Sequence, residues 1–194
     1  MLETLQSHTL HPRYLNSDSR VLDIGGCIGQ FGHAIHERFG CKVIGVEADP
    51  DNVKVCQSRI GCEYHHLAIS DDAGMASFHR GAKADGGSLL DRGEKSSGEM
   101  VSVQCLTLPQ LMERIGWQDI DLLKIDVEGI ELALFDAWPD SLFERIGQIT
   151  IEWHDFHRPN AMYGEEEVHK RVSRLKNLSW DMVKMSRVAT RTLG

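Results

Sequence analysis

Short runs of apolar residues alternate with longer stretches of helical period along most of the chain. This alternation is typical of a parallel sheet covered by helices. The predicted strands lie at 20–24, 42–46, 62–69, 120–126 and 146–153. The predicted helices between them lie at 30–39, 50–59, 109–115 and 130–138. We therefore expect an α/β fold with a mostly parallel central sheet and helices on both faces.

The alternation fails between residues 70 and 98, where glycines and aspartates crowd together. We expect residues 75–80 to pair as a strand with residues 101–106, whose apolar positions partly alternate. Residues 81–99 would then form a long loop. A loop of this length in a compact domain is either mobile surface or part of a binding site.

Both ends of the chain add smaller pieces to this core. A helix is predicted to begin at residue 165, and residues 181–185 and 188–193 are predicted to close the sheet as an antiparallel pair. The length favours a single domain over residues 1–194, in which residues 1–19 form an N-terminal extension.

The chain is acidic, with 21 lysines and arginines against 29 aspartates and glutamates and a net charge of −8. Because it lacks a broad positive field, we do not expect nucleic acid as a partner. No apolar run approaches the roughly 20 residues that cross a bilayer, and residues 1–20 contain no continuous apolar segment of a signal peptide. We expect a cytoplasmic protein with no membrane partner.

The cysteines argue against a disulfide framework and against a thiolate zinc site. Their number is odd and no two are spaced as Cys-x-x-Cys, so we interpret them as small buried residues in a reducing compartment. The segment from Glu152 to His157 concentrates metal-ligand residue types, but its spacing is a weak signal and no metal is expected. The cysteines are Cys27, Cys41, Cys56, Cys62 and Cys105.

A glycine-rich turn joins the first predicted strand to the first predicted helix. Three glycines within five residues, Gly25, Gly26 and Gly29, favour close approach of a ligand, although a tight turn without a ligand remains an alternative. A dinucleotide fingerprint starting at Gly25 requires glycines where the chain has Cys27 and Gln30. A phosphate-binding P-loop also fails, because no Gly-Lys-Ser/Thr follows.

Acidic residues flank this turn. Glu47 ends the second strand 22 positions after Gly25, close to the spacing at which a carboxylate reaches ribose hydroxyls. Asp23 precedes the turn and is expected to meet an amino group directly or through water, while no lysine or arginine lies within the turn to hold a phosphate. Ribose and an ammonium group without a phosphate suggest S-adenosylmethionine. A solvated carboxylate is the alternative for Glu47.

Four segments together resemble the FkbM family of class I S-adenosylmethionine-dependent methyltransferases. They are Asp23-Ile-Gly-Gly-Cys-Ile-Gly-Gln-Phe31, Val46-Glu-Ala-Asp-Pro50, Leu67-Ala-Ile-Ser-Asp71 and Leu123-Lys-Ile-Asp-Val-Glu-Gly-Ile-Glu131. The resemblance implies a Rossmann-like class I methyltransferase fold. It also implies a cofactor site around the Gly-rich turn and the next two strand ends, at Asp23, Gly25, Gly26, Cys27, Gly29, Glu47, Ala48 and Ala68. The chain has Gly25-Gly26-Cys27 where the family often has Gly-Ala-Asn, so a side-chain amide that would order the turn is missing.

Candidate catalytic residues follow the fourth and fifth strands, because ligands of open α/β sheets collect outside the carboxyl ends. Asp126 ends strand four with Glu128 just beyond it, and Glu152 and His154 lie at the end of strand five. His154 is the first candidate for a general base because its ordinary pKa lies nearest neutrality, and Asp126 is the second. Helix capping for Asp126 and Glu128, cofactor binding for Asp126, and a purely structural role for His154 remain alternatives.

We therefore expect a methyltransferase that acts on a hydroxyl of a small molecule or saccharide, the acceptor class being implied by the resemblance. The net charge favours a neutral or cationic acceptor, and a homo-oligomer is possible. The alternatives are a non-catalytic S-adenosylmethionine-binding or regulatory protein on the same fold and, with less support, an NAD-linked oxidoreductase.

Overall fold

A five-stranded parallel sheet forms the centre of the computed structural model, which describes residues 1–83, 86–91, 93, 96–154, 164–178, 180, 183–185 and 188–190. Its strand order is β10-β9-β3-β4-β5, so the predicted Rossmann-like architecture is confirmed. The strands are β3 (Arg20–Ile24), β4 (Lys42–Glu47), β5 (Cys62–His66), β9 (Ile120–Ile125) and β10 (Ile146–Ile151).

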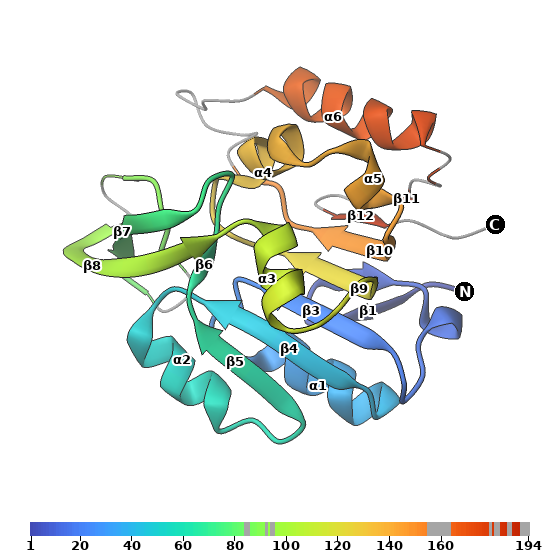
Figure 1. Cartoon of the computed structure of the whole chain (residues 1–194), viewed down its shortest axis with the longest axis horizontal. Coiled ribbons are helices and arrows are strands. Elements are labelled where there is room, and N and C mark those ends of the chain that lie inside the picture. Colours follow the sequence, from blue (N-terminus) through green and yellow to red (C-terminus); the bar gives the residue numbers. More distant parts are fainter. Residues whose placement is uncertain are drawn as a thin grey trace.

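Helices cover both faces of this sheet (Figure 1). Side chains alternate along β3, so that Val21 packs with the α1 side while Leu22 and Ile24 pack into the larger core on the other face. One face carries α1 (Gln30–Phe39) and α2 (Pro50–Gln57), as right-handed crossovers in one winding direction require. The other carries α3 (Leu108–Arg114), α4 (Glu131–Ala137), α5 (Asp140–Phe143) and α6 (Glu165–Asn177). The single predicted helix 130–138 is thus followed by a separate turn of helix beyond Pro139.

The N-terminal extension is an ordered part of the sheet's packing. It forms a hairpin of β1 (Glu3–Leu5) and β2 (His8–Leu10), followed by the short 3-10 helix η1 (Pro12–Tyr14). All three residues of β2 are buried. The Gln148 side chain of β10 accepts a hydrogen bond from the His11 N–H at 2.7 Å and donates one to the His11 carbonyl at 3.3 Å. The hairpin is therefore fixed to the central sheet.

A second sheet contains β6 (Ala68–Ile69), β8 (Ser96–Leu106) and β7 (Gly74–Gly81), in that order. The predicted pairing of 75–80 with 101–106 is confirmed. The single strand predicted at 62–69 is wrong, because the chain leaves the central sheet at Leu67 and β6 pairs with β8 instead. The predicted loop 81–99 is too long, since Gly81 pairs with Ser96 and β8 begins there.

The C-terminal strands β11 (Val183–Met185) and β12 (Val188–Thr190) pair antiparallel as predicted. The prediction that they close the central sheet is wrong, because among the described residues they form a two-stranded sheet of their own, with β12 beside β10 and β2. The rest of the predicted pair, at 181–182 and 191–193, lies outside the described residues. None of the described helices combines the length and apolar character needed to cross a membrane.

Candidate active site

A pocket of about 380 Å³ opens at the carboxyl ends of β3, β4 and β9. The chain winds outward from β3 in both directions, and ligands of open α/β sheets bind at this reversal point. The N-terminal hairpin and the second sheet complete its walls. The lining residues are Gln6, Ser7, His8, Ile24, Gly25, Gly26, Cys27, Ile28, Gln30, Phe31, Val46, Glu47, Ala48, Asp49, Leu67, Ala68, Ile69, Phe78, Gly81, Gly87, Leu89, Lys124, Asp126, Val127, Glu128, Ile130 and Glu152.

The glycines of the turn are required by packing of the protein against itself. Gly25 has φ +78°, and a Cβ there would lie 1.8 Å from the backbone oxygen of Asp126. A Cβ on Gly26 would lie 2.2 Å from Cε1 of Tyr64. The backbone of the turn can therefore lie against β9 and the tyrosine ring while its other side lines the pocket.

Glu47 holds the turn from the end of β4. Its carboxylate accepts hydrogen bonds from the N–H of Cys27 and the N–H of Asp49, both at 2.7 Å. Burial raises the pKa of Glu47 to about 7, because the loss of hydration outweighs the two N–H donors that favour the ionised form. This buried carboxylate therefore anchors the turn to the end of β4 through the N–H of Cys27.

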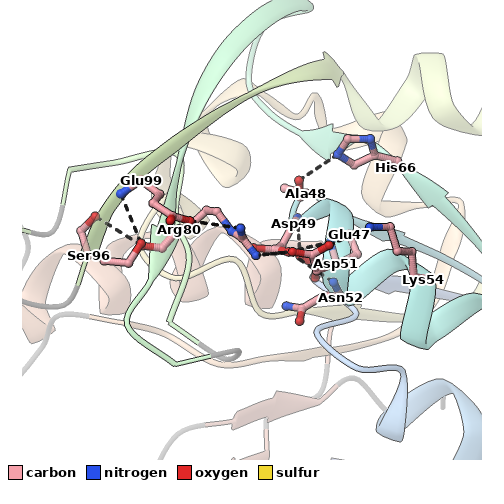
Figure 2. Close-up of polar contacts among 11 residues, drawn as sticks. Glu47, Ala48, Asp49, Asp51, Asn52, Lys54, His66, Arg80, Ser96 and Glu99 are labelled. Carbon is pink, nitrogen blue, oxygen red and sulfur yellow. Dashed lines mark hydrogen bonds and ion pairs between the residues drawn. The ribbon is translucent and has the colours of Figure 1, made fainter.

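The first turn of α2 links this wall to the second sheet (Figure 2). Asp49 caps the helix by accepting hydrogen bonds from the N–H groups of Asp51 and Asn52. Arg80 of β7 forms ion pairs with Asp49 at 2.7 Å, Asp51 at 2.8 Å and Glu99 at 3.2 Å. The arginine therefore fastens β7 and β8 beside the Glu47 wall.

A buried charge network lies beneath the pocket on the α1 face. Lys124 Nζ is 3.1 Å from Asp23 Oδ1 and 3.6 Å from Asp126 Oδ2. The Tyr64 hydroxyl donates a hydrogen bond to Asp23 Oδ2 at 2.5 Å. Burial disfavours the charged form of Lys124. The attraction of Asp23 and Asp126 outweighs this effect and raises the pKa of Lys124. Asp23 itself has no exposed surface.

His154 lies behind a group of carboxylates at the ends of β9 and β10. Its Nδ1 hydrogen-bonds Glu131 at 2.8 Å, while Nε2 is 3.3 Å from Glu128, 3.7 Å from Asp126 and 3.8 Å from Glu152. Burial opposes protonation, but Glu131, Asp126 and Glu152 together outweigh it and raise the pKa of His154. The surrounding acids therefore favour the protonated form of the imidazole.

A second histidine reaches the same acids from the N-terminal hairpin. His8 lines the pocket, and its Nε2 lies 3.9 Å from Asp126 Oδ2. Burial and the Lys124 ammonium lower the pKa of His8 to about 4, against the opposing effect of Asp126 and Asp23. The pKa values of the two histidines that flank Asp126 are therefore shifted in opposite directions.

The family model described as "Methyltransferase FkbM domain" matches residues 23–177. The chain belongs to this family. It is accordingly an S-adenosylmethionine-dependent methyltransferase. A search among curated proteins gave no significant match.

Solved structures share the fold of this methyltransferase at low sequence identity. A fibrillarin/Nop5p complex matches with a TM-score of 0.53 and 12% identity over 93% of this chain and 75% of that one. A fibrillarin from Methanococcus jannaschii gives 0.51 and 11%, over 95% and 68% of the two chains. An rRNA methylase from Streptococcus thermophilus gives 0.50 and 9%, over 94% and 92%. At these identities the likeness establishes the fold alone.

Most residues proposed from the sequence line the methyltransferase pocket. Of the cofactor candidates, Asp23 and Gly29 do not: Asp23 lies beneath the floor, and Gly29 begins α1 with φ +73° against α2. Of the catalytic candidates, His154 does not. The candidates in the lining are Gly25, Gly26, Cys27, Glu47, Ala48, Ala68, Asp126, Glu128 and Glu152.

Sequence reasoning missed four residues of this site: His8, Tyr64, Lys124 and Glu131. Lys124 and Glu131 stand inside the Leu123–Glu131 motif, so their proximity to Asp126 and Glu128 was a usable signal. Tyr64 occupies an apolar strand position, and His8 belongs to a segment without a predicted element.

Proposed function

We propose that the pocket binds S-adenosylmethionine with its ribose at Glu47, and that the protein methylates a hydroxyl of a small molecule or saccharide. Glu47 is the observation that carries the proposal. Its oxygens are fixed by two backbone N–H groups at the end of β4, yet the residue still lines the pocket. A carboxylate in this position of the fold accepts hydrogen bonds from ribose hydroxyls.

The pocket's other residues fit this cofactor. Ala48, Ala68, Ile69 and Phe78 offer an apolar wall beside Glu47 for a flat base. The volume lies within the roughly 300–1,000 Å³ range of small-molecule sites. Among the described lining residues Lys124 is the one lysine or arginine, and two carboxylates pair with it, so this part of the pocket offers no free cation for a phosphate.

The acidic end of the pocket supports the acceptor role. Bound S-adenosylmethionine supplies an electrophilic methyl group on a positively charged sulfur. Asp126, Glu128 and Glu152 line the end near β9 and β10. They would orient an acceptor hydroxyl, and one of them would take its proton as the oxygen forms its bond to carbon and a neutral thioether leaves. His154 would hold these carboxylates in position from behind.

Calorimetry with S-adenosylhomocysteine tests the cofactor site. We expect wild-type protein to bind and Glu47→Ala to bind more weakly while remaining folded. Glu63→Ala is the matched control, because Glu63 lies on β5 outside the lining and its side chain is 51% exposed. Folded wild-type protein that fails to bind, or equal affinity in Glu47→Ala, would contradict the proposal.

The acceptor class needs a separate assay, with labelled S-adenosylmethionine and a panel of small-molecule and saccharide hydroxyls. Methyl incorporation into a panel member that base treatment does not remove would indicate an ether and support O-methylation. Cofactor binding without incorporation into any member would favour the non-catalytic alternative.

A further inference from the structure

We propose that His8, Asp126 and Glu152 form a binding site for a divalent cation at the acidic end of the pocket. The three residues come from β2, the end of β9 and the end of β10. One ligand atom from each lies within 4.8 Å of the others, and all three residues line the pocket. Three segments far apart in the sequence thus converge on one small volume with an open side for further ligands.

The buried imidazole of His8 distinguishes this site from an ordinary cluster of acidic residues. Its side chain is only 4% exposed, yet its Nε2 has no hydrogen bond to any described residue and faces Asp126 Oδ2 at 3.9 Å. The other nitrogen, Nδ1, lies 3.3 Å from the hydroxyl of buried Thr150. When Nδ1 donates this bond, the Nε2 lone pair is left for a metal, which is the arrangement found in metal-ligating histidines.

The ligand types indicate which cation fits. One imidazole nitrogen with two carboxylates suits a first-row divalent ion such as Mn²⁺, because Mg²⁺ and Ca²⁺ prefer sites made of oxygen alone. Asp126 also faces the Lys124 ammonium at 3.6 Å, so Asp126 and Glu152 offset the ion's charge together with Glu128, which lines the same pocket. Water or substrate would fill the remaining positions from the pocket, as in catalytic metal sites.

A second group of Asp126, Glu128 and His154 also has its ligand atoms within 4.8 Å. It is the weaker candidate, because Nε2 of His154 already faces three carboxylates at 3.3–3.8 Å. His154 also lies outside the pocket lining. The ring therefore serves as an ion-pair partner, and His8 is the better ligand.

The bound cation would also act on the methyl acceptor, an inference that rests on the proposed function. A divalent ion held by Asp126 and Glu152 would bind the acceptor hydroxyl and make it more acidic. Glu128 would then be the carboxylate left to take the proton. This favours acceptors whose hydroxyl has a second oxygen nearby, since such a pair can chelate the ion.

Titration with Mn²⁺, followed by the loss of the free-ion electron paramagnetic resonance signal, tests the site without cofactor or acceptor. Its outcome is therefore independent of the proposed function. We expect one ion per chain in wild-type protein. Because losing an outer-shell partner alone weakens metal binding about 10–100-fold, His8→Ala and Glu152→Gln should each lose at least about tenfold in affinity.

His65→Ala is the matched control, because His65 lies on β5 outside the pocket, and it should bind Mn²⁺ like the wild type. No binding up to about 1 mM Mn²⁺, or equal affinity in folded His8→Ala, would overturn the proposal. If His8→Ala does not fold, nuclear magnetic resonance on wild-type protein decides. Selective broadening of the His8 ring protons by substoichiometric Mn²⁺ supports the site, and equal broadening of His8 and His65 refutes it.

Discussion

The buried carboxylate of Glu47 should make ribose binding depend on pH. Its pKa lies at about 7, because burial removes hydration that the N–H groups of Cys27 and Asp49 do not fully replace. Ribose hydroxyls donate hydrogen bonds, so they bind best to the ionised carboxylate. Protonation of Glu47 as the pH falls should therefore weaken the contact.

The size of the effect follows from the pKa. With a pKa of about 7, Glu47 is about 9% ionised at pH 6 and about 91% ionised at pH 8. If ribose binds only the ionised form, its contribution to affinity falls about tenfold between pH 8 and pH 6. The direction is fixed by the raised pKa, because an acid at its ordinary value of 4.5 would stay ionised over this whole interval.

The assay is calorimetry with S-adenosylhomocysteine and its 2′,3′-dideoxy analogue at pH 6, 7 and 8. Both ligands carry the same amino group, so the ratio of their affinities isolates the ribose contact from titration elsewhere. We expect the preference for the natural ligand to rise about tenfold from pH 6 to pH 8. A ratio independent of pH would refute either the raised pKa or the contact between Glu47 and ribose.

Three substitutions test the architecture around the pocket. Tyr64→Phe removes the buried hydrogen bond to Asp23 and should lower the free energy of unfolding by about 1.5–3 kcal/mol in urea, whereas no change would show that the bond is dispensable. Gly26→Ala places a methyl group against the Tyr64 ring and should cost about 1–3 kcal/mol in the same experiment, and a neutral result would mean that the ring moves freely. Arg80→Ala releases β7 from the start of α2 and should weaken S-adenosylhomocysteine binding severalfold. The surface variant Arg38→Ala should leave this affinity unchanged, and equal effects of the two substitutions would argue against a positioning role for Arg80.

The central sheet could be predicted because β3, β4, β9 and β10 are largely apolar runs bounded by helix signals. The exit at Leu67 could not be predicted in the same way. Leu67 opens the apolar stretch Leu67-Ala-Ile69 directly after β5, and the change of sheet depends on pairing between Ala68 and Cys105, distant in sequence. Strand breaks that depend on such a partner leave no local pattern.

The N-terminal hairpin was missed for a conformational reason. Its turn residues Gln6 and Ser7 have φ of +47° and +68°, a conformation that hairpin turns usually assign to Asn or Gly. Because neither Asn nor Gly marks this turn, the sequence predicts residues 1–19 only as an N-terminal extension. His8, which the hairpin brings to Asp126, was missed with it.

Some site residues were predicted for the physical reason that the structure shows, and others for a different reason. Spacing placed Glu47 at the end of β4, where the structure has it. Gly25 and Gly26 line the pocket, but Asp126 and Tyr64 are what exclude a side chain there. The glycines in the sequence indicate either a bound ligand or a tight turn without one. They do not indicate that Asp126 and Tyr64 occupy the space where a Cβ would lie.

The net negative charge of the chain bears on ligand preference at the pocket. Among the described residues, five carboxylates around its acidic end face Lys124 and His154; the acids are Asp23, Asp126, Glu128, Glu131 and Glu152. This excess of negative charge favours a cationic methyl donor or a metal ion over a phosphorylated acceptor. Methyl transfer turns the sulfonium into a neutral thioether, so the same charges attract the donor more strongly than its product. The whole-chain balance of −8 could suggest the sign of this preference, but only the convergence of β2, β9 and β10 shows where it acts.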